Sequence, residues 1–431
     1  MLQGGVGILI PTGKPEATRR AISSVRESPE LRRSMIERGL QRIRQYDSAY
    51  IARRYIEELY RPVLERSQLP HRHPQRNRVR KIGRRILQVA LRSSKMQEAV
   101  LRFLRVRRPY TILCYHQIQA SSEYVAPYDP GLVISTERLE QQLRLLLTHY
   151  DIITVRELRQ QLSRQPLPAR PLLALTFDDG YESVFTQAAP VLEKFGLRAT
   201  VFVNASVLGN RSILWPDAIN LLVHHTPYHQ LLDECQKILE GPQSNQVRYV
   251  LDASTSARDL IGYLKSLPAS LVSLLVERLW ERFGATIPEE ARPRYLNADQ
   301  IRLLHKKGFE IGGHTIHHPI LTRASPEMIE REIGEDKRQL ETIIGEPLTS
   351  FAYPNGDYNE AIQRVVAKQG YTCAVTTGAE LRRRTSMDFF ALDRYCISNL
   401  TAQDGQGIFG EARFFAELSG MLSALRGYVR K

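Results

Sequence analysis

Two short segments of this 431-residue chain carry side chains that can bind cations and move protons. In the first, Asp178 and Asp179 stand side by side after an apolar run and just before Gly180. Adjacent residues at a strand end point to different sides, so one carboxylate can bind a cation while the other accepts a proton. A turn that caps the following helix explains the same residues equally well, because Asp before Gly is common at turns.

The second segment places two histidines four residues apart, after an apolar run that ends at Gly312. On one helical turn the imidazoles of His314 and His318 face the same way and can share an ion, as in other His-x-x-x-His sites. Such a pair alone is weak evidence. Together with two aspartates at another predicted strand end, and with Thr315 placed for a local hydrogen bond, it predicts a metal site.

The elements that must position these residues alternate regularly from Tyr110 onward. Apolar runs typical of strands lie at 111–115, 172–177, 199–203, 309–312, 350–353 and 372–375, and helical patterns at 136–147, 181–195, 326–344 and 359–368. This alternation indicates parallel β/α units that close toward a barrel, with the chemistry at the C-terminal ends of the strands. Residues 207–296 are expected to form a helical insertion that covers this face.

These segments resemble the polysaccharide deacetylase family (the NodB-homology domain, carbohydrate esterase family 4). The resemblance runs from Thr111 to about Ser398. It lies in Thr-Phe-Asp-Asp-Gly-Tyr at 176–181, His-Thr-x-x-His at 314–318, Phe-Ala-Tyr-Pro-Asn-Gly at 351–356 and Tyr-His-Gln-Ile at 115–118. It implies an α/β fold, a distorted (β/α)7-type barrel of the NodB kind, that hydrolyses carbon–nitrogen bonds other than peptide bonds.

The resemblance also implies roles for individual residues. Asp178 becomes the general base, and Asp179, His314 and His318 become ligands of one divalent metal, zinc first, with cobalt, nickel, manganese or iron as alternatives. His317 is then not a ligand. Substrate contacts are expected from the aromatic and turn residues of the same motifs: Tyr181, Tyr353, Pro354 and Asn355. A backbone N–H of the turn at 354–356 is expected to help stabilise the oxyanion.

The chain departs from the family pattern in two places. The family's late general-acid histidine is missing, since no histidine follows His318. His116, at a predicted strand end, is therefore our candidate for the acid or for a substrate contact. The family's arginine before the Pro-x-Gly turn is Ala352 here, and we predict that Arg394 replaces it beside Asp178. Equally, Arg394 could pair with Asp393 or with a helix end.

The N-terminal quarter differs in charge and in resemblance. Residues 1–108 hold 26 Lys/Arg against 9 Asp/Glu. Residues 1–66 resemble the C-terminal tail of a GT-B family 4 glycosyltransferase, through Gly-Val-Gly-Ile-Leu-Ile-Pro at 5–11, Lys-Pro-Glu-Ala at 14–17, Ser-Pro-Glu-Leu-Arg at 28–32 and Tyr-Ile-Glu-Glu-Leu-Tyr at 55–60. The nucleotide-sugar segment of that family would precede Met1, so this fragment is expected to be inactive.

Residues 67–108 form a basic linker with an amphipathic pattern. A solvated helix packed on the next domain, attachment to an anionic membrane surface, and nucleic-acid binding all fit this charge, but no motif specific for nucleic acid accompanies it. The predicted domains are thus 1–66, 67–108, the deacetylase-like domain 109–399 with its insertion at 207–296, and a helical tail at 400–431.

Function and location follow from these features. We expect a hydrolase that removes N-linked acetyl groups from an N-acetylhexosamine-containing polysaccharide, glycan precursor or lipid-linked sugar, in surface-polysaccharide synthesis and with a glycosyltransferase partner. The alternative is a non-catalytic sugar-binding or scaffolding protein of a membrane-associated assembly. The four cysteines are far apart in sequence, and no signal peptide or membrane span is visible, so a cytoplasmic protein, peripheral at the membrane, is expected.

Overall fold

The structure is a computed structural model. It describes residues 110–120, 131–164, 168–239, 257–377 and 387–399, with single residues at 129, 401, 410, 411, 414 and 418. The predicted glycosyltransferase-like fragment at 1–66, the basic segment at 67–108 and nearly all of the tail at 400–431 lie outside these residues. Within the described ranges, no helix combines the length and the apolar character that crossing a membrane requires.

The body is built on one parallel sheet of eight strands, in the order β10-β1-β5-β6-β7-β8-β9, with β4 paired to β5 beside this path. The strands are β1 (Tyr110–Tyr115), β4 (Asp151–Ile153), β5 (Leu172–Phe177), β6 (Thr200–Val203), β7 (Glu310–Gly313), β8 (Ser350–Ala352), β9 (Cys373–Val375) and β10 (Tyr395–Cys396). From β5 to β9, neighbouring strands follow one another along the chain. Each connection between them contains helix, as parallel pairing requires.

The two faces of the strands serve two cores. In β1 and β5, Leu113 and Leu175 pack outward among residues that the helices cover, whereas Ile112 and Ala174 belong to a separate inner cluster. This two-residue alternation is that of a sheet buried on both faces. The sheet also curls back on itself, because Val375 bridges to Leu392 and β10 then pairs with β1. The predicted distorted α/β barrel is confirmed.

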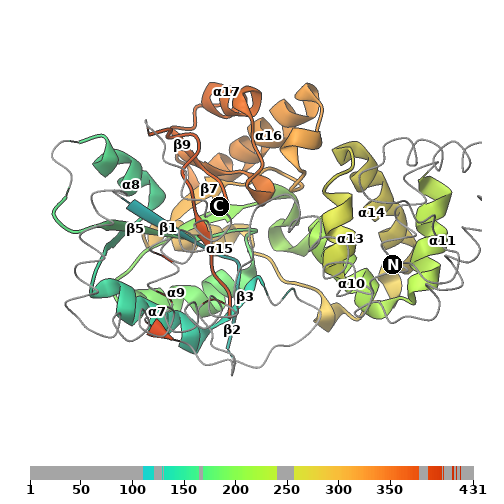
Figure 1. Ribbon diagram of the computed structural model, residues 1–431, viewed down its shortest axis with the longest axis horizontal. Coiled ribbons are helices and arrows are strands. Elements are labelled where there is room, and N and C mark those ends of the chain that lie inside the picture. The colour runs from blue at the N-terminus through green and yellow to red at the C-terminus, as the bar shows by residue number, and fades with distance from the viewer. Residues whose placement is uncertain are drawn as a thin grey trace, which may run out of the picture. The chain divides into compact units, whose positions relative to one another are not determined.

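Helices cover the outside of the sheet (Figure 1). They are α7 (Thr136–Leu147), α8 (Val155–Leu162), α9 (Ala189–Lys194), α15 (Ala298–Lys306), α16 (Pro326–Ile344) and α17 (Glu360–Lys368), with short turns η2 (Val184–Ala188), η3 (Ala205–Asn210), η6 (Leu321–Arg323) and η7 (Pro354–Gly356). Capping residues in the sequence mark where several of these helices begin. Thr154 and Asn297 each begin a helix with a capping box, and Ser325 caps α16 ahead of a proline.

A second group of helices stands to one side of the sheet in Figure 1. It consists of α10 (Trp215–His225), α11 (Tyr228–Ile238), α13 (Ala257–Leu264) and α14 (Ala269–Phe283), followed by η4 (Gly284–Thr286) and η5 (Glu289–Ala291). These helices share an apolar core of their own that includes Leu222, Leu264 and Leu275. They lie within the predicted insertion at 207–296, and their separate core explains how such an insertion folds onto a barrel without disturbing the strands.

Three features differ from the sequence expectation. The helix expected at 181–195 is interrupted by the wide turn η2, in which Ala189 N–H donates to Val184 O, five residues back. Pro190 lacks an N–H and its ring crowds the preceding turn, which favours such a distortion. The short strand β4 and the two-stranded sheet of β2 (Gln117–Gln119) and β3 (Val133–Ser135) were not expected.

Candidate active site at the strand ends

Strand β5 ends in two buried carboxylates whose backbones differ. Asp178 continues the inward-facing set of β5, two residues after Thr176, whereas Asp179 has a left-handed φ of 71° that re-aims its side chain. Gly180 follows with φ 67°, and a Cβ there would lie 3.0 Å from Val203 Cγ1. The left-handed backbone of Asp179 is strained for a residue other than glycine, and such strain is found most often at functional sites. The two carboxylates therefore serve different surroundings, as the sequence predicts.

Asp179 lies beside two histidines that follow β7, the second strand from β5 in the sheet. Its Oδ1 lies 3.4 Å from His314 Nε2 and 3.5 Å from His318 Nε2, and the three buried residues form a group that could hold a metal ion. Asp179 Oδ1 has no hydrogen-bond partner among the described residues. A buried carboxylate oxygen that faces two imidazole nitrogens and lacks a donor fits a divalent cation, whose charge would replace the missing bond.

The two imidazoles are prepared for this role in different ways. His314 Nδ1 lies 2.7 Å from the carbonyl oxygen of Ala352. Nδ1 must therefore carry the proton, which leaves the lone pair of Nε2 toward Asp179, an arrangement typical of metal-binding histidines. Burial lowers the pKa of His318 to about 4, so this imidazole is neutral near pH 7. Both rings can then donate a lone pair.

The expected helical turn between His314 and His318 is wrong. The segment is an irregular loop with left-handed φ values at Thr315 (69°) and His318 (58°), and the ring centroids of the two histidines are 4.9 Å apart. Thr315 Oγ1 accepts a hydrogen bond from His318 N, as its local position suggested. The loop brings the rings together because buried groups on other elements fix its backbone.

Two carboxylates on α16, missed in the sequence, hold this loop. Glu332 accepts hydrogen bonds from Ile316 N and His317 N, and also lies 2.8 Å from His317 Nδ1. Asp336 accepts from His314 N, and burial raises its pKa well above the usual value. The sequence contained a signal for these two residues, because Glu332 and Asp336 are four positions apart and so lie on one face of the predicted helix, the face that is buried. His317 itself points to Glu332, away from the metal-binding group.

Asp178 is held by an arginine from the far end of the chain. Arg394 Nη1 and Nη2 donate to Asp178 Oδ1 and Oδ2, each over 2.7 Å, and Nη1 also donates to Thr176 Oγ1. Arg394 is fully buried. Burial alone would raise the pKa of Asp178, but the charge and hydrogen bonds of Arg394 more than offset it, so the pKa is lowered. The contact expected across the closed barrel is present, and Arg394 Nε also donates to the carbonyl oxygen of Thr376.

His116 follows β1 and lies beside the same carboxylate. It forms a second possible metal-binding group with Cys114 and Asp178, and its Nδ1 is buried without a hydrogen-bond partner among the described residues. Cys114 Sγ donates to Asp178 Oδ2 over 3.4 Å. All four cysteines are free thiols, as expected. However, Cys114 is in register with Cys396 across β1 and β10, a pairing that their wide separation in the sequence concealed.

Three of the four predicted substrate-contact residues are buried. Tyr181 is 3% exposed, and Tyr353 is fully buried with its hydroxyl donating to the carbonyl oxygen of Phe390. Pro354 is buried, whereas Asn355 is exposed and left-handed with φ 57°. In the same turn, Gly356 N–H donates to Tyr353 O and is not free for an oxyanion.

A buried acid from the insertion, also missed, explains where the Tyr181 hydroxyl lies. Tyr181 and Tyr295 stack at 5.4 Å, and both hydroxyls donate to Asp217 Oδ2, over 2.8 and 2.6 Å. Burial raises the pKa of Asp217 to about 7, although the two tyrosine bonds act in the opposite direction. This cluster ties α10 to the residue that follows Gly180, and so couples the insertion to the site.

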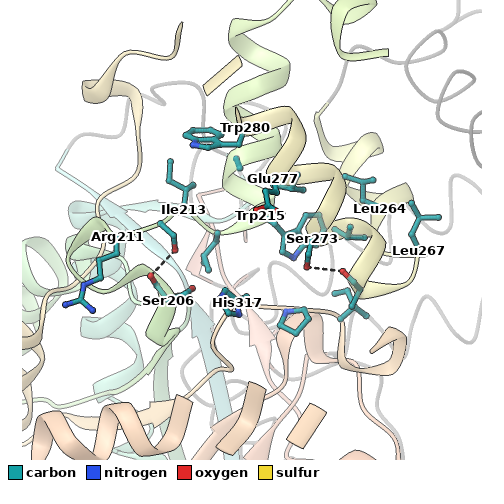
Figure 2. Close-up of a pocket in the computed structure, with 18 residues that line it drawn as sticks. Ser206, Arg211, Ile213, Trp215, Leu264, Leu267, Ser273, Glu277, Trp280 and His317 are labelled. Carbon is teal, nitrogen blue, oxygen red and sulfur yellow. Dashed lines mark hydrogen bonds between the residues drawn. The ribbon is translucent and has the colours of Figure 1, made fainter. Parts of the chain in front are cut away.

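A cavity of about 510 Å³ opens between the insertion and the histidine loop (Figure 2). Trp215, Trp280 and other apolar side chains of the insertion line it, with His317 at its edge. Trp215 Nε1 donates to the carbonyl oxygen of His318 over 2.9 Å. The loop that carries the two histidines therefore has the metal-binding group on one side and this apolar cavity on the other. The cavity is of a size that holds small ligands.

Comparison with known proteins shows what this part of the chain is similar to. The polysaccharide deacetylase family model matches residues 167–238 and 252–374. The YxkH protein of Bacillus subtilis, provisionally named a polysaccharide deacetylase, is 20% identical over 312 residues, 72% of this chain and 79% of that protein. The peptidoglycan-N-acetylglucosamine deacetylase of Bacillus cereus is 34% identical over 71 residues, 16% of this chain and 33% of that protein.

The fold was also compared with solved structures. The Streptococcus pyogenes deacetylase PplD in complex with acetate is similar with a TM-score of 0.42 and 20% identity, over 68% of this chain and 93% of that chain. The matched segments of the family model begin just before β5 and end in β9, so they enclose both the Asp-Asp and the His-x-x-x-His segments. Residues 167–238 and 252–374, which are less than half of the chain, are therefore similar to the polysaccharide deacetylase family, and this similarity supports a hydrolase of the deacetylase kind.

Proposed function

We propose that this protein is a metal-dependent N-deacetylase that removes acetyl groups from N-acetylhexosamine units of a polysaccharide or glycan precursor. One observation carries the proposal: Asp179 and two histidines converge, and Asp179 Oδ1 has no hydrogen-bond partner within the described part of the chain. Beside it, a buried arginine binds both carboxylate oxygens of Asp178. Asp179 can therefore bind a cation while Asp178 accepts a proton, and metal-assisted amide hydrolysis requires both functions.

The residues Asp179, His314 and His318 would hold the ion. A bound divalent metal would supply Lewis-acid chemistry, polarising the acetamide carbonyl and lowering the pKa of a water molecule. One carboxylate and two neutral imidazoles are a ligand set typical of catalytic zinc, which supports zinc ahead of cobalt, nickel, manganese or iron. The hydrogen bond from His314 Nδ1 to Ala352 O would keep that ring oriented when the ion leaves.

Asp178 acts as the general base in this proposal. Arg394 keeps its carboxylate ionised and fixes both oxygens, so that a proton is accepted in one orientation. His314 Nε2 lies 3.9 Å from Asp178 Oδ2, so the base lies beside the metal-binding group. A water placed between the two would be within reach of both.

The leaving amine needs a proton, and His116 is our candidate to deliver it. Its ring lies within reach of Asp178, and its Nδ1 has no hydrogen-bond partner in the part of the chain that the structure describes. The substrate class rests on resemblance: two relatives bear the names peptidoglycan-N-acetylglucosamine deacetylase and chitin deacetylase. A role in surface-polysaccharide synthesis, beside an anionic membrane and a glycosyltransferase, extends this proposal from the charge and motifs of residues 1–108.

Acetate release tests the proposal directly. The full chain would be stripped with a chelator, reloaded with zinc or cobalt, and offered N-acetylated oligosaccharides, lipid-linked N-acetylated sugars and O-acetylated sugars. We expect release from an N-acetylated substrate by the reloaded protein and none by the stripped one. Release that survives chelation, or release from O-acetyl groups alone, would contradict it.

A further inference from the structure

Asp178 also belongs to a second group of metal-binding side chains. Cys114, His116 and Asp178 each offer one ligand atom, and these atoms all lie within 4.8 Å of one another. The thiol of Cys114 donates to Asp178 Oδ2, and the buried Nδ1 of His116 has no partner among the described residues. The thiol of Cys114 can exchange its proton for a cation, and His116 Nδ1 can bind the same cation.

A second thiol, that of Cys396, lies on the strand that closes the barrel. Cys396 is in register with Cys114 across β10 and β1, so both side chains leave the sheet on the same face. Unlike Cys114, Cys396 is exposed to solvent, which gives an ion a route to the buried thiol. We call these four residues the thiol cluster: Cys114, Cys396, His116 and Asp178.

The charges around the thiol cluster select the ion. Arg394 is buried against Asp178 and would repel a dication that arrived alone. Two thiolates cancel the charge of a dication, so binding requires that both thiols lose their protons to the solvent as the ion enters. Ions that prefer sulfur meet this condition, whereas magnesium and calcium, which prefer oxygen, do not.

We propose that the thiol cluster is a second cation site, specific for sulfur-binding divalent ions such as zinc and cadmium. Its four ligands, two sulfurs, one nitrogen and one oxygen, match a closed tetrahedral zinc site. The two sites use adjacent aspartates: Asp179 would bind the first ion and Asp178 the second. Occupation of the thiol cluster therefore withdraws Asp178 from proton transfer and inhibits turnover; this consequence rests on the proposed function, but the binding does not.

Cobalt titration of the reduced full chain tests the binding. Thiolate–cobalt bonds give a near-ultraviolet charge-transfer band that carboxylate and imidazole ligands do not give. We expect roughly two cobalt ions per chain, with the band present in wild type and in His314→Ala, which keeps the thiol cluster but lacks one ligand of the other group. Cys396→Ser and Cys114→Ser should each lose the band and one equivalent of metal.

Matched controls use the thiols outside the cluster. Cys373, buried in β9 of the same sheet, and Cys235, buried in α11, can be replaced by serine, and both variants should keep the band. Cys396 is exposed, so its serine variant should fold; cadmium should also protect this thiol from a maleimide in wild type. A band that persists in Cys396→Ser, or unprotected labelling with cadmium in excess, would overturn the proposal.

The kinetic consequence has its own readout. Zinc added beyond one equivalent should reduce acetate release by wild type by roughly 10²-fold or more, the scale expected when a general base is lost. Cys396→Ser should resist this inhibition while Cys373→Ser should not. If wild type releases no acetate under any loading, the proposed function fails while the cobalt band still decides the cation site; inhibition that is equal in both variants would refute the regulatory part.

Discussion

The strand ends of the barrel and the helical insertion differ in what they bury: charged groups in the first region and apolar side chains in the second. At the strand ends, charged groups are buried and each is fixed by named partners, such as Arg394 on Asp178 and Glu332 on the histidine loop. The insertion instead packs an apolar core and leaves a cavity of about 510 Å³. Buried charges tolerate little change, because an orphaned partner costs more than an apolar contact. Chemistry should therefore depend on the first region and substrate fit on the second.

Breaking the metal-binding group should have the largest effect. His314→Ala removes one of the ligands that face Asp179, and we expect loss of stoichiometric zinc and of acetate release to the level of the stripped protein. Metal content by mass spectrometry and acetate release measured on one sample check this. The exposed neighbour provides the control, since His317→Ala should keep the metal. Full zinc content and turnover in His314→Ala would show that the ligands lie elsewhere.

Removing the arginine should be the next largest change. Arg394→Met should lower turnover by roughly 10²-fold, the scale for losing acid–base support, while the metal content stays unchanged. Arg394 holds the pKa of Asp178 below its usual value, so the variant should raise that pKa. Activity needs ionised Asp178, so the acidic limb of the pH–rate profile should move to higher pH. An unshifted limb with near-normal turnover would limit Arg394 to a structural role.

Replacing Glu332, which binds the histidine loop, should have a smaller effect. A second buried acid, Glu310, shows whether that effect comes from the position of Glu332 or only from its burial. Glu332→Gln weakens three hydrogen bonds to the histidine loop, and zinc affinity should fall about 10-fold, as for other outer-shell changes. Glu310 is an equally buried acid at the opposite end of β7 that binds Thr200 and Ser350. Glu310→Gln should lower the melting temperature without changing zinc affinity. Equal effects on affinity would mean that burial alone explains both.

The insertion should give the smallest effect. Trp280 lines the cavity but contacts none of the proposed ligands, so Trp280→Ala should raise KM about 5-fold, equivalent to about 1 kcal/mol for one aromatic contact, and leave kcat unchanged. Steady-state kinetics on a soluble N-acetylated oligosaccharide would measure this. A fall in kcat with unchanged KM would instead show that the insertion acts on the chemistry, through Trp215 or the Asp217 cluster.

The same comparison explains what the sequence could reveal. Strands of four to six residues and capped helices, such as α7 and α16, were predictable because their period and caps are local. The two aspartates and two histidines were recognisable as motifs, and Arg394 from the need for a charge beside Asp178. The irregular histidine loop, the Cys114–Cys396 register and the tyrosine pair on Asp217 depend on contacts between distant segments, which no single segment encodes.

The separation of ligand and base is the central claim, and Asp178→Asn tests it most directly. Asparagine keeps the shape and the acceptor for Arg394 but cannot accept a proton from water. Zinc content and acetate release would be measured on the same purified sample, beside wild type. We predict one zinc retained by Asp179 and the two histidines, with turnover reduced by roughly 10²-fold or more. Zinc lost together with activity, or turnover near wild type with zinc retained, would contradict the assignment of these two adjacent carboxylates.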